Sequence, residues 1–397
     1  MKNNEQTRLV QQALNQNILF YEKIEYKNWL TCVASKWSPI EFDLLKRFDK
    51  TTKAKNLSEP LLKRIFVFLK ELQFQKDAKD LMWDYRLYEA ISEFQMEGKI
   101  CKGKLKNILQ DPINSCLFKG FHCFLIDNNI PYDSIAGLNY LKWLPKLILN
   151  KIVRLAEACG VMPLFNPEEH TRNRCAEFWD QAVINKILNK IELELKIPLE
   201  FPNPFINEYG IQTAKGLISA RPCDAIYQAF RLNGLNNLFG FKKIIEIGGG
   251  LGRTAYYAHK FGIKDYTIVD LPHVVVAQAL FIGQTLGEER LCLPNEAKMQ
   301  EFKNGIKLIT PDIFFSNKEK YDLCLNADSF VEMDFEVAKN YLDKLKTSCS
   351  GLLSINQEAY KFRLLDCLKL PDLMIKILRY PYWMRKGYVE DLLLFKS

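Results

Sequence analysis

The stretch Lys242-Lys-Ile-Ile-Glu-Ile-Gly-Gly-Gly-Leu-Gly-Arg-Thr-Ala255 predicts the fold of the second half of the chain. Its apolar run, residues 244–247, has the length and β-branched composition of a buried strand. Glycines follow at once, and the sequence from Arg253 to Lys260 is typical of a helix. A glycine loop lets the backbone approach a ligand closely, and the N-terminus of the next helix offers free N–H groups. We therefore predict a nucleotide-type binding turn.

After residue 240, short β-branched runs alternate with helical stretches. The runs at 244–247, 266–269, 306–309, 323–326 and 352–355 predict five strands, and the segments between them suit crossover helices. Two more runs, 373–379 and 388–395, are separated by a connection short enough for a hairpin. We predict an α/β fold with a Rossmann-like, doubly wound sheet of seven strands that ends in an antiparallel pair.

Two cofactor classes fit the glycine loop. The run from Gly250 to Ala255 matches the dinucleotide fingerprint G-x-G-x-x-G/A, and Asp270 lies 20 residues beyond Gly250, where an acid can bind a ribose. Glu246, however, begins the acid-x-Gly-x-Gly-x-Gly pattern of methyltransferases that use S-adenosylmethionine (SAM), and a carboxylate there would repel a pyrophosphate. Only about 155 residues follow Lys242, too few for a second mononucleotide half and a substrate domain. These observations, with the closing hairpin, favour SAM over NAD.

The first half of the chain has a different pattern. Apolar residues recur at helical spacing over 61–72 and 144–156, and residues 177–195 form a strongly amphipathic stretch. Pro145 is expected to interrupt or bound one of these helices. Prolines at 198, 202 and 204 then suggest a rigid connection. We predict a mostly α-helical domain at 1–205, serving as a substrate lid or in oligomerisation, followed by the cofactor-binding domain at 206–397.

Composition excludes several classes of protein. The chain has 397 residues, of which 48% are hydrophobic and 26% charged, and no apolar run is long enough to span a bilayer. Its 11 cysteines include no CxxC pair, which argues against a zinc ribbon or a disulfide framework. The net charge of +8 could assist an anionic substrate, but no basic stripe with aromatic residues suggests nucleic-acid binding. We expect a cytoplasmic protein with no metal site, and leave a homo-oligomer open.

The ends of parallel strands supply the predicted cofactor site, because ligands of open α/β sheets bind at the carboxyl edge. Asp270 is expected to bind the ribose hydroxyls, Leu271 to cover the adenine and Asp312-Ile313 to meet its amino group. The residues after the fourth strand lie where sulfonium and acceptor would meet. The full predicted set is Glu246, Gly248, Gly249, Gly250, Gly252, Arg253, Asp270, Leu271, Asp312, Ile313, Asn326 and Ser329.

The chain resembles the bacterial sugar O-methyltransferases, a SAM-dependent class I family often associated with surface polysaccharide genes. The resemblance rests on the motifs at 246–258, 265–272 and 326–333, and on Asn166-Pro-Glu-Glu and Ala225-Ile-Tyr upstream. It covers about residues 160–397. It implies O-methyl transfer to a sugar, nucleotide-sugar or glycan. Asp328 departs from the neutral polar residue that the resemblance leads us to expect at this position.

Methyl transfer to a hydroxyl calls for positioning and for a general base. Carboxylates on the loops after the fourth and fifth strands are the best candidates: Glu332 first, then Asp328 and Glu358. Arg221 and Tyr227 are expected to line the acceptor site, since Arg binds phosphates and aromatic faces suit sugar rings. Two alternatives stay open: a methyltransferase of small aromatic or lipid-linked metabolites, and a catalytically silent SAM-binding scaffold.

Overall fold

The structure is a computed structural model of the chain. It describes residues 45–47, 57–72, 90–112, 115–118, 120–121, 130–131, 133–164, 180–203, 208–359, 361–368 and 377–395. The predicted domain boundary after residue 205 lies outside these residues, as do positions 373–376 of the sixth predicted strand and positions 177–179 of the amphipathic stretch. The two-domain organisation therefore stays a prediction.

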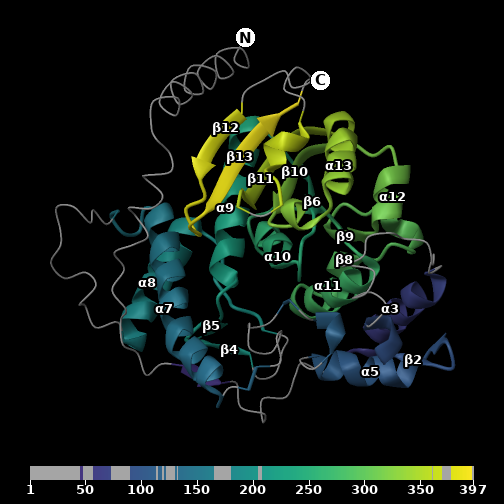
Figure 1. Cartoon of the computed structure of the whole chain (residues 1–397), viewed down its shortest axis with the longest axis horizontal. Helices are drawn as coiled ribbons and strands as arrows, with labels where there is room; N and C mark the ends of the chain where they lie inside the picture. Colours follow the sequence, from purple (N-terminus) through teal and green to yellow (C-terminus); the bar gives the residue numbers. More distant parts are fainter. Residues whose placement is uncertain are drawn as a thin grey trace.

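An eight-stranded sheet forms the centre of the molecule, in the order β12-β13-β11-β10-β6-β7-β9-β8 (Figure 1). Neighbours from β8 to β11 run parallel, whereas β13 is antiparallel to both β11 and β12. The prediction of a doubly wound sheet closed by an antiparallel hairpin is confirmed. The eighth strand, β8, was not predicted because it has only two residues. The strands are β6 (Lys243–Ile247), β7 (Asp265–Val269), β8 (Leu291–Cys292), β9 (Gly305–Ile309), β10 (Tyr321–Ala327), β11 (Cys349–Gln357), β12 (Ile377–Pro381) and β13 (Tyr388–Leu394).

Helices cover both faces of this sheet, as its nearly continuously buried strands require. Ile244 and Leu323 pack into the larger core with α9 (Pro222–Phe239), α10 (Arg253–Lys260) and α11 (Pro272–Thr285). Their neighbours Ile245 and Cys324 point the other way, into a second core with α12 (Pro311–Ser316) and α13 (Phe335–Ser348). Short 3-10 turns complete the connections: η3 (Glu288–Arg290), η4 (Ala297–Gln300), η5 (Phe330–Glu332) and η6 (Leu364–Cys367).

The described part of the first half adds four helices: α3 (Glu59–Glu71), α5 (Lys102–Gln110), α7 (Ile135–Ala158) and α8 (Gln181–Leu195). The expectation that Pro145 interrupts a helix is wrong. α7 continues through Pro145 because its buried face, including Leu144, Ile148 and Ile152, anchors both sides of the weakened turn. Asp180 begins α8, since its carboxylate accepts a hydrogen bond from the Val183 amide (2.8 Å).

Small strands that the sequence patterns did not predict also occur in the first half and just after it. β1 (Leu45–Arg47) pairs with β4 (Tyr209–Thr213), and β4 pairs with β5 (Gly216–Ile218), forming a three-stranded antiparallel sheet. A two-residue hairpin joins β2 (Gln95–Met96) and β3 (Lys99–Ile100), and η2 (Cys116–Phe118) follows α5. Pairings of β1 with β4 link positions more than 160 residues apart, so local sequence carries little information about them.

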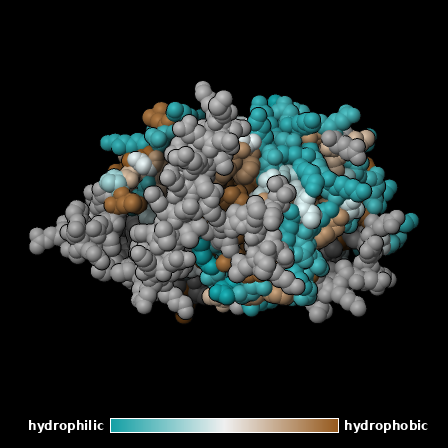
Figure 2. Space-filling model, turned by 90° about the horizontal axis from the view of Figure 1, so that it is seen from above, coloured by the Kyte–Doolittle hydropathy of each residue, from teal (hydrophilic) through white to brown (hydrophobic). Residues whose placement is uncertain are grey.

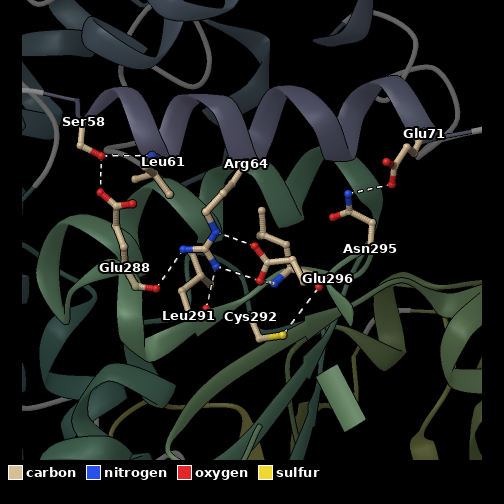
Figure 3. A network of polar contacts seen from close by, with 10 residues as sticks. Ser58, Leu61, Arg64, Glu71, Glu288, Leu291, Cys292, Asn295 and Glu296 are labelled. Carbon is tan, nitrogen blue, oxygen red and sulfur yellow. Dashed lines mark hydrogen bonds and ion pairs between the residues drawn. The ribbon is translucent and has the colours of Figure 1, made fainter. Parts of the chain in front are cut away.

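α3 lies against α11 and the loop after it, far from α7 and α8 (Figure 1). Leu61 packs so closely on Gly283 of α11 that a Cβ there would lie 2.8 Å from a Leu61 methyl. Arg64 adds polar contacts: its guanidinium donates to the Glu296 carboxylate (2.9 Å) and to the carbonyls of Glu288 (2.9 Å) and Leu291 (2.7 Å) (Figure 3). This one side chain therefore satisfies backbone and carboxylate acceptors of the sheet-bearing half.

Replacing Arg64 by Met is expected to lower the free energy of unfolding by about 2–3 kcal/mol, because it leaves a partly buried carboxylate and two carbonyls without their charged donor. Urea unfolding of the full chain measures this. Lys106→Met is the matched control, since Lys106 also pairs with a glutamate, Glu59, but at an exposed position. We expect a far smaller effect there. Equal effects of both variants would contradict the importance of the Arg64 contacts.

The described surface is mixed in character. Figure 2 shows hydrophilic residues around smaller hydrophobic patches on one face of the molecule. Among the helices that the structure describes, none combines the length and the hydropathy needed to cross a membrane.

Candidate functional site

The glycine loop joins β6 to α10 at the carboxyl edge of the sheet, and its conformation requires glycine. Gly248, Gly250 and Gly252 have φ angles of +73°, +54° and +86°, in the left-handed region. Gly248 also has no room for a side chain, because a Cβ there would lie 2.3 Å from the Ser329 Oγ. A Cβ at Gly250, in contrast, would meet only a Phe121 ring carbon at 3.8 Å. There is therefore open space beside Gly250.

Glu246 lies beneath this loop. Its side chain is buried, its carboxyl accepts a hydrogen bond from the Tyr266 hydroxyl (3.0 Å), and a Cβ on Gly249 would lie 3.1 Å from its Oε2. Burial, followed by the nearby charge of Asp270, raises the pKa of Glu246 to about 8. The sequence analysis places Glu246 among the predicted cofactor residues. In the structure its carboxyl lies under the loop and is bound by Tyr266.

Asp270 follows β7, the neighbour of β6, and its carboxyl faces the glycine loop. It accepts hydrogen bonds from the Leu271 amide (2.9 Å) and from Gln278 Nε2 (2.8 Å). Burial raises the pKa of Asp270 to about 7, although these donors and the amides of Gly250 and Gly249 favour its charged form. Asp270 as a whole residue is nevertheless partly exposed at this edge of the sheet.

Asn326 and Ser329 were predicted to contact the cofactor. In this structure their side chains hydrogen-bond to the end of β6 instead. Both donate to the carbonyl of Ile247, the last residue of β6, at 3.0 and 2.9 Å. Asn326 Oδ1 also accepts from the Asn356 amide (2.9 Å), so the Asn326 side chain is fully buried between the ends of β6, β10 and β11. Its polar atoms are bonded within the protein, and it offers none to a ligand. Ser329 sets the position of Gly248.

The remaining predicted cofactor residues surround the loop less closely. Arg253 is buried, and its guanidinium contacts the Phe121 carbonyl (3.4 Å) and the Glu208 carboxylate (3.8 Å). Asp312 is exposed in the first turn of α12. Its charge and that of Asp270 both act on Tyr341, which indicates that the two acids approach the same part of α13. Leu271 precedes α11, and Ile313 packs against the second core.

Asp328, directly after β10, forms a second cluster at the same edge. Its φ angle is +67°, a strained conformation for a residue with a side chain. The Tyr388 hydroxyl lies 2.8 and 2.7 Å from its two oxygens, and Arg385 Nη1 donates to Oδ2 (3.1 Å). Burial raises the pKa of Asp328, while Tyr388 and Arg385 oppose the rise. The Asp328 side chain is still 33% exposed, so it can meet an acceptor.

Tyr388 and Arg385 were missed by the sequence analysis. Both belong to the closing hairpin, and Tyr388 pairs in register with Gln357, the last residue of β11. The antiparallel return of β13 therefore brings Tyr388 to the carboxyl edge beside Asp328. Only the predicted hairpin could have signalled this, and its register was not known.

The other predicted acceptor residues divide into two groups. Glu332 lies near Asp328, since its charge contributes to the raised pKa of Tyr388. Arg221 also lies near, because its charge favours the ionised form of Asp328, and it donates to the Gly120 carbonyl (2.6 Å). Glu358, however, is ion-paired with Arg379. Its carboxylate is therefore bound by a residue of the closing hairpin, as the carboxylate of Asp328 is by Arg385.

Tyr227 does not line an open site. It is buried between α9 and the sheet, with its hydroxyl 3.5 Å from the Glu390 carboxylate and its ring packed edge-on against Tyr382. Its position on α9 faces the core, so the structure does not support the prediction that it binds substrate. Within the described ranges, no three His, Cys, Asp or Glu side chains are grouped to hold a metal ion.

Solved structures of methyltransferases are similar to part of this chain, whereas no protein-family model and no curated protein sequence matches it. Mitomycin 7-O-methyltransferase has 15% identity and a TM-score of 0.33, over 45% of this chain and only 56% of that one. Magnesium protoporphyrin IX methyltransferase from Synechocystis PCC 6803, solved with bound SAM, has 11% identity and a TM-score of 0.31, over 56% of this chain and 99% of that one. The methyltransferase domain of bacterial CtHen1 has 12% identity and a TM-score of 0.29, over 43% and 99%.

Similarities this slight do not identify the activity of the chain. The class of fold is therefore defined by the structure itself. The chain has a doubly wound, Rossmann-like α/β fold with a glycine-loop site where β6 and β7 end. In such sheets, ligands bind at the carboxyl edge of the parallel strands. The clusters around Asp270 and Asp328 both lie at that edge.

Proposed function

We propose that the protein is a SAM-dependent O-methyltransferase that acts on a hydroxyl of a sugar, nucleotide-sugar or glycan. The observation that carries the proposal is that two sites lie at one edge of the sheet. The first is the glycine loop after β6 together with Asp270. The second is Asp328 after the neighbouring strand β10, bound by Tyr388 and Arg385. The first offers backbone and a carboxylate to a nucleoside. The second offers hydrogen-bonding groups to a hydroxylated acceptor.

The residues of the first site fit SAM. A side chain at Gly250 would meet almost nothing, so a ligand has room to approach the loop there, and the neighbouring Asp270, a partly exposed residue, supplies a carboxyl group for a ribose diol. The exposed Asp312 suits the adenine amino group, as predicted. Glu246 is buried, so it supports the loop from below rather than binding the methionine ammonium group. When bound, SAM supplies an electrophilic methyl group on its sulfonium.

Asp328 is the best general base. Its raised pKa makes it a stronger base than an ordinary aspartate, and its partial exposure lets it approach an acceptor hydroxyl. Asp328 would accept the proton of the acceptor hydroxyl while SAM supplied the methyl group, and Tyr388 and Arg385 hold the Asp328 carboxylate in place. The products are the methyl ether and S-adenosylhomocysteine. Glu332, the first choice from sequence, is the second candidate.

SAM titration of the full chain tests the cofactor. Wild-type protein is expected to bind SAM, and Asp270→Asn to bind it about 100-fold more weakly, because two charge-assisted hydrogen bonds to the ribose are weakened. Asp265→Asn, at the opposite end of β7, is the control and should leave the affinity unchanged. Tight NAD binding without SAM binding would overturn the proposal.

The acceptor is tested by methyl transfer from SAM to a panel of nucleotide-sugars, glycans, small phenols and lipid-linked sugars. Turnover with sugar hydroxyls is expected. Turnover with phenols alone would reassign the acceptor class. SAM binding without turnover on any member of the panel would instead favour a catalytically silent scaffold.

A further inference from the structure

Gln278 is a buried polar residue to which the sequence analysis assigned no role. It lies on α11 with no exposed surface, and its Nε2 donates to the Gly250 carbonyl (2.8 Å) and to Asp270 Oδ2 (2.8 Å). Both partners are acceptors, which fixes the orientation of the amide. Its Oε1 is buried and has no hydrogen-bond partner among the described residues. The side chain is thus committed to bridging the loop and the carboxylate.

We propose that Gln278 is the positioning residue of the cofactor site, which sets the Asp270 carboxylate and the glycine loop in the arrangement that receives the ribose of SAM. This inference rests on the proposed function. Without Gln278, the Gly250 carbonyl and Asp270 Oδ2 would be adjacent acceptors that share no donor. Two such oxygens repel each other, so the loop or the carboxylate would move.

The helix that carries Gln278 is held firmly, as a positioning role requires. Gly283, five residues further along α11, is packed against Leu61 of α3. Ile282 lies against the glycine loop, since a Cβ on Gly252 would be 3.1 Å from its Cδ1. α11 is therefore fixed between α3 and the loop, and the amide of Gln278 has little freedom to shift.

The charges around Asp270 define the expected pH dependence. Glu246 on β6 and Tyr341 on α13 interact with it, Asp312 on α12 acts on the same tyrosine, and His273 lies three residues further along the chain. Gln278, unlike these titratable groups, is uncharged. It donates a hydrogen bond to the Asp270 carboxylate and so favours the ionised form of Asp270. Ribose hydroxyls donate to a carboxylate, so SAM affinity is expected to rise with pH through the pKa of Asp270, about 7. Removing Gln278 should move this rise to higher pH.

The test is SAM titration by calorimetry from pH 6 to pH 9 on the full chain. Gln278→Met keeps the length of the side chain but removes both donors, and we expect affinity at pH 8 to fall about tenfold or more. Gln278→Glu is nearly isosteric and adds a negative charge beside Asp270, so it should bind SAM more weakly still. Gln284→Met, the same change on the same helix, is the control.

The outcomes separate the two proposals. If wild-type protein does not bind SAM at any pH, the proposed function fails. If it binds SAM but the Gln278 variants bind equally well, or lose affinity with an unchanged pH midpoint, the positioning role is wrong and Gln278 is only structural. Thermal unfolding identifies a variant that does not fold. If Gln278→Met does not fold, the SAM affinity and pH midpoint of Gln278→Glu are compared with those of the wild-type protein instead.

Discussion

Asp328→Asn is expected to lower kcat by about 10²- to 10⁴-fold, the usual contribution of a general base, with little change in SAM affinity. Asparagine keeps the size of the side chain and can still accept from Tyr388 and Arg385, but it cannot take a proton. The left-handed backbone at this position also tolerates asparagine well. The variant should therefore fold and bind SAM while losing chemistry.

Single-turnover methyl transfer and SAM titration measure the two effects separately. Asp322→Asn is the matched control, because Asp322 lies on β10 near its other end, where it accepts hydrogen bonds from the amides of Lys242 and Lys243. It should retain normal kcat. Full activity of Asp328→Asn together with inactivity of Glu332→Gln would move the base to Glu332. Full activity of both variants would exclude either carboxylate.

Gly248→Ala is expected to have the largest effect on the fold of the site. The alanine must adopt a φ near +73°, which costs about 1–2 kcal/mol. Its Cβ would also lie 2.3 and 2.4 Å from Ser329 Oγ and Cβ, and relieving such overlap costs about 1–3 kcal/mol. We therefore expect the free energy of unfolding to fall by about 2–5 kcal/mol and SAM binding to be lost, because Ser329 and the Ile247 carbonyl hold the loop.

Two variants separate backbone strain from steric overlap in this prediction. Gly240 has a φ of +75°, and a Cβ at that position would meet nothing within 4 Å, so Gly240→Ala measures the conformational cost alone. The double variant Gly248→Ala/Ser329→Gly removes both clashing atoms and should recover part of the stability. If Gly248→Ala is no more destabilising than Gly240→Ala, the close contact with Ser329 is not a constraint. Chemical denaturation of the full chain gives all the values.

The main sheet could be predicted because its signals are local. Each buried parallel strand is a short apolar run, and the glycines of the loop directly follow one of these runs, so residues 242–255 predicted β6, the loop and α10 together. β8 is too short to produce a pattern. Pro145 gave a wrong prediction, because tertiary packing of α7 outweighs one lost hydrogen bond.

The candidate site was predicted only in part. Asp270 and the glycine loop follow from position along the chain, since residues after parallel strands meet at one edge. Whether such a residue faces a ligand or the interior depends on its neighbours. Asn326 and Glu246 are buried by partners on other strands, Asn356 and Tyr266, and Glu358 is ion-paired with Arg379 from the hairpin. Gln278 reaches the loop from a different helix.

The sequence by itself determined the order of the longer strands of the main sheet with their crossover helices, the closing hairpin and the glycine loop from 246 to 252, because these depend on residues within a few positions of one another. The tertiary structure alone decided which carboxylates are exposed and which polar side chains are hydrogen-bonded within the protein. It also decided how Arg64 holds α3 against Glu296, 232 residues away. Burial, charge pairing and steric room arise between segments distant in the chain. They exist only once the sheet and its helices have packed.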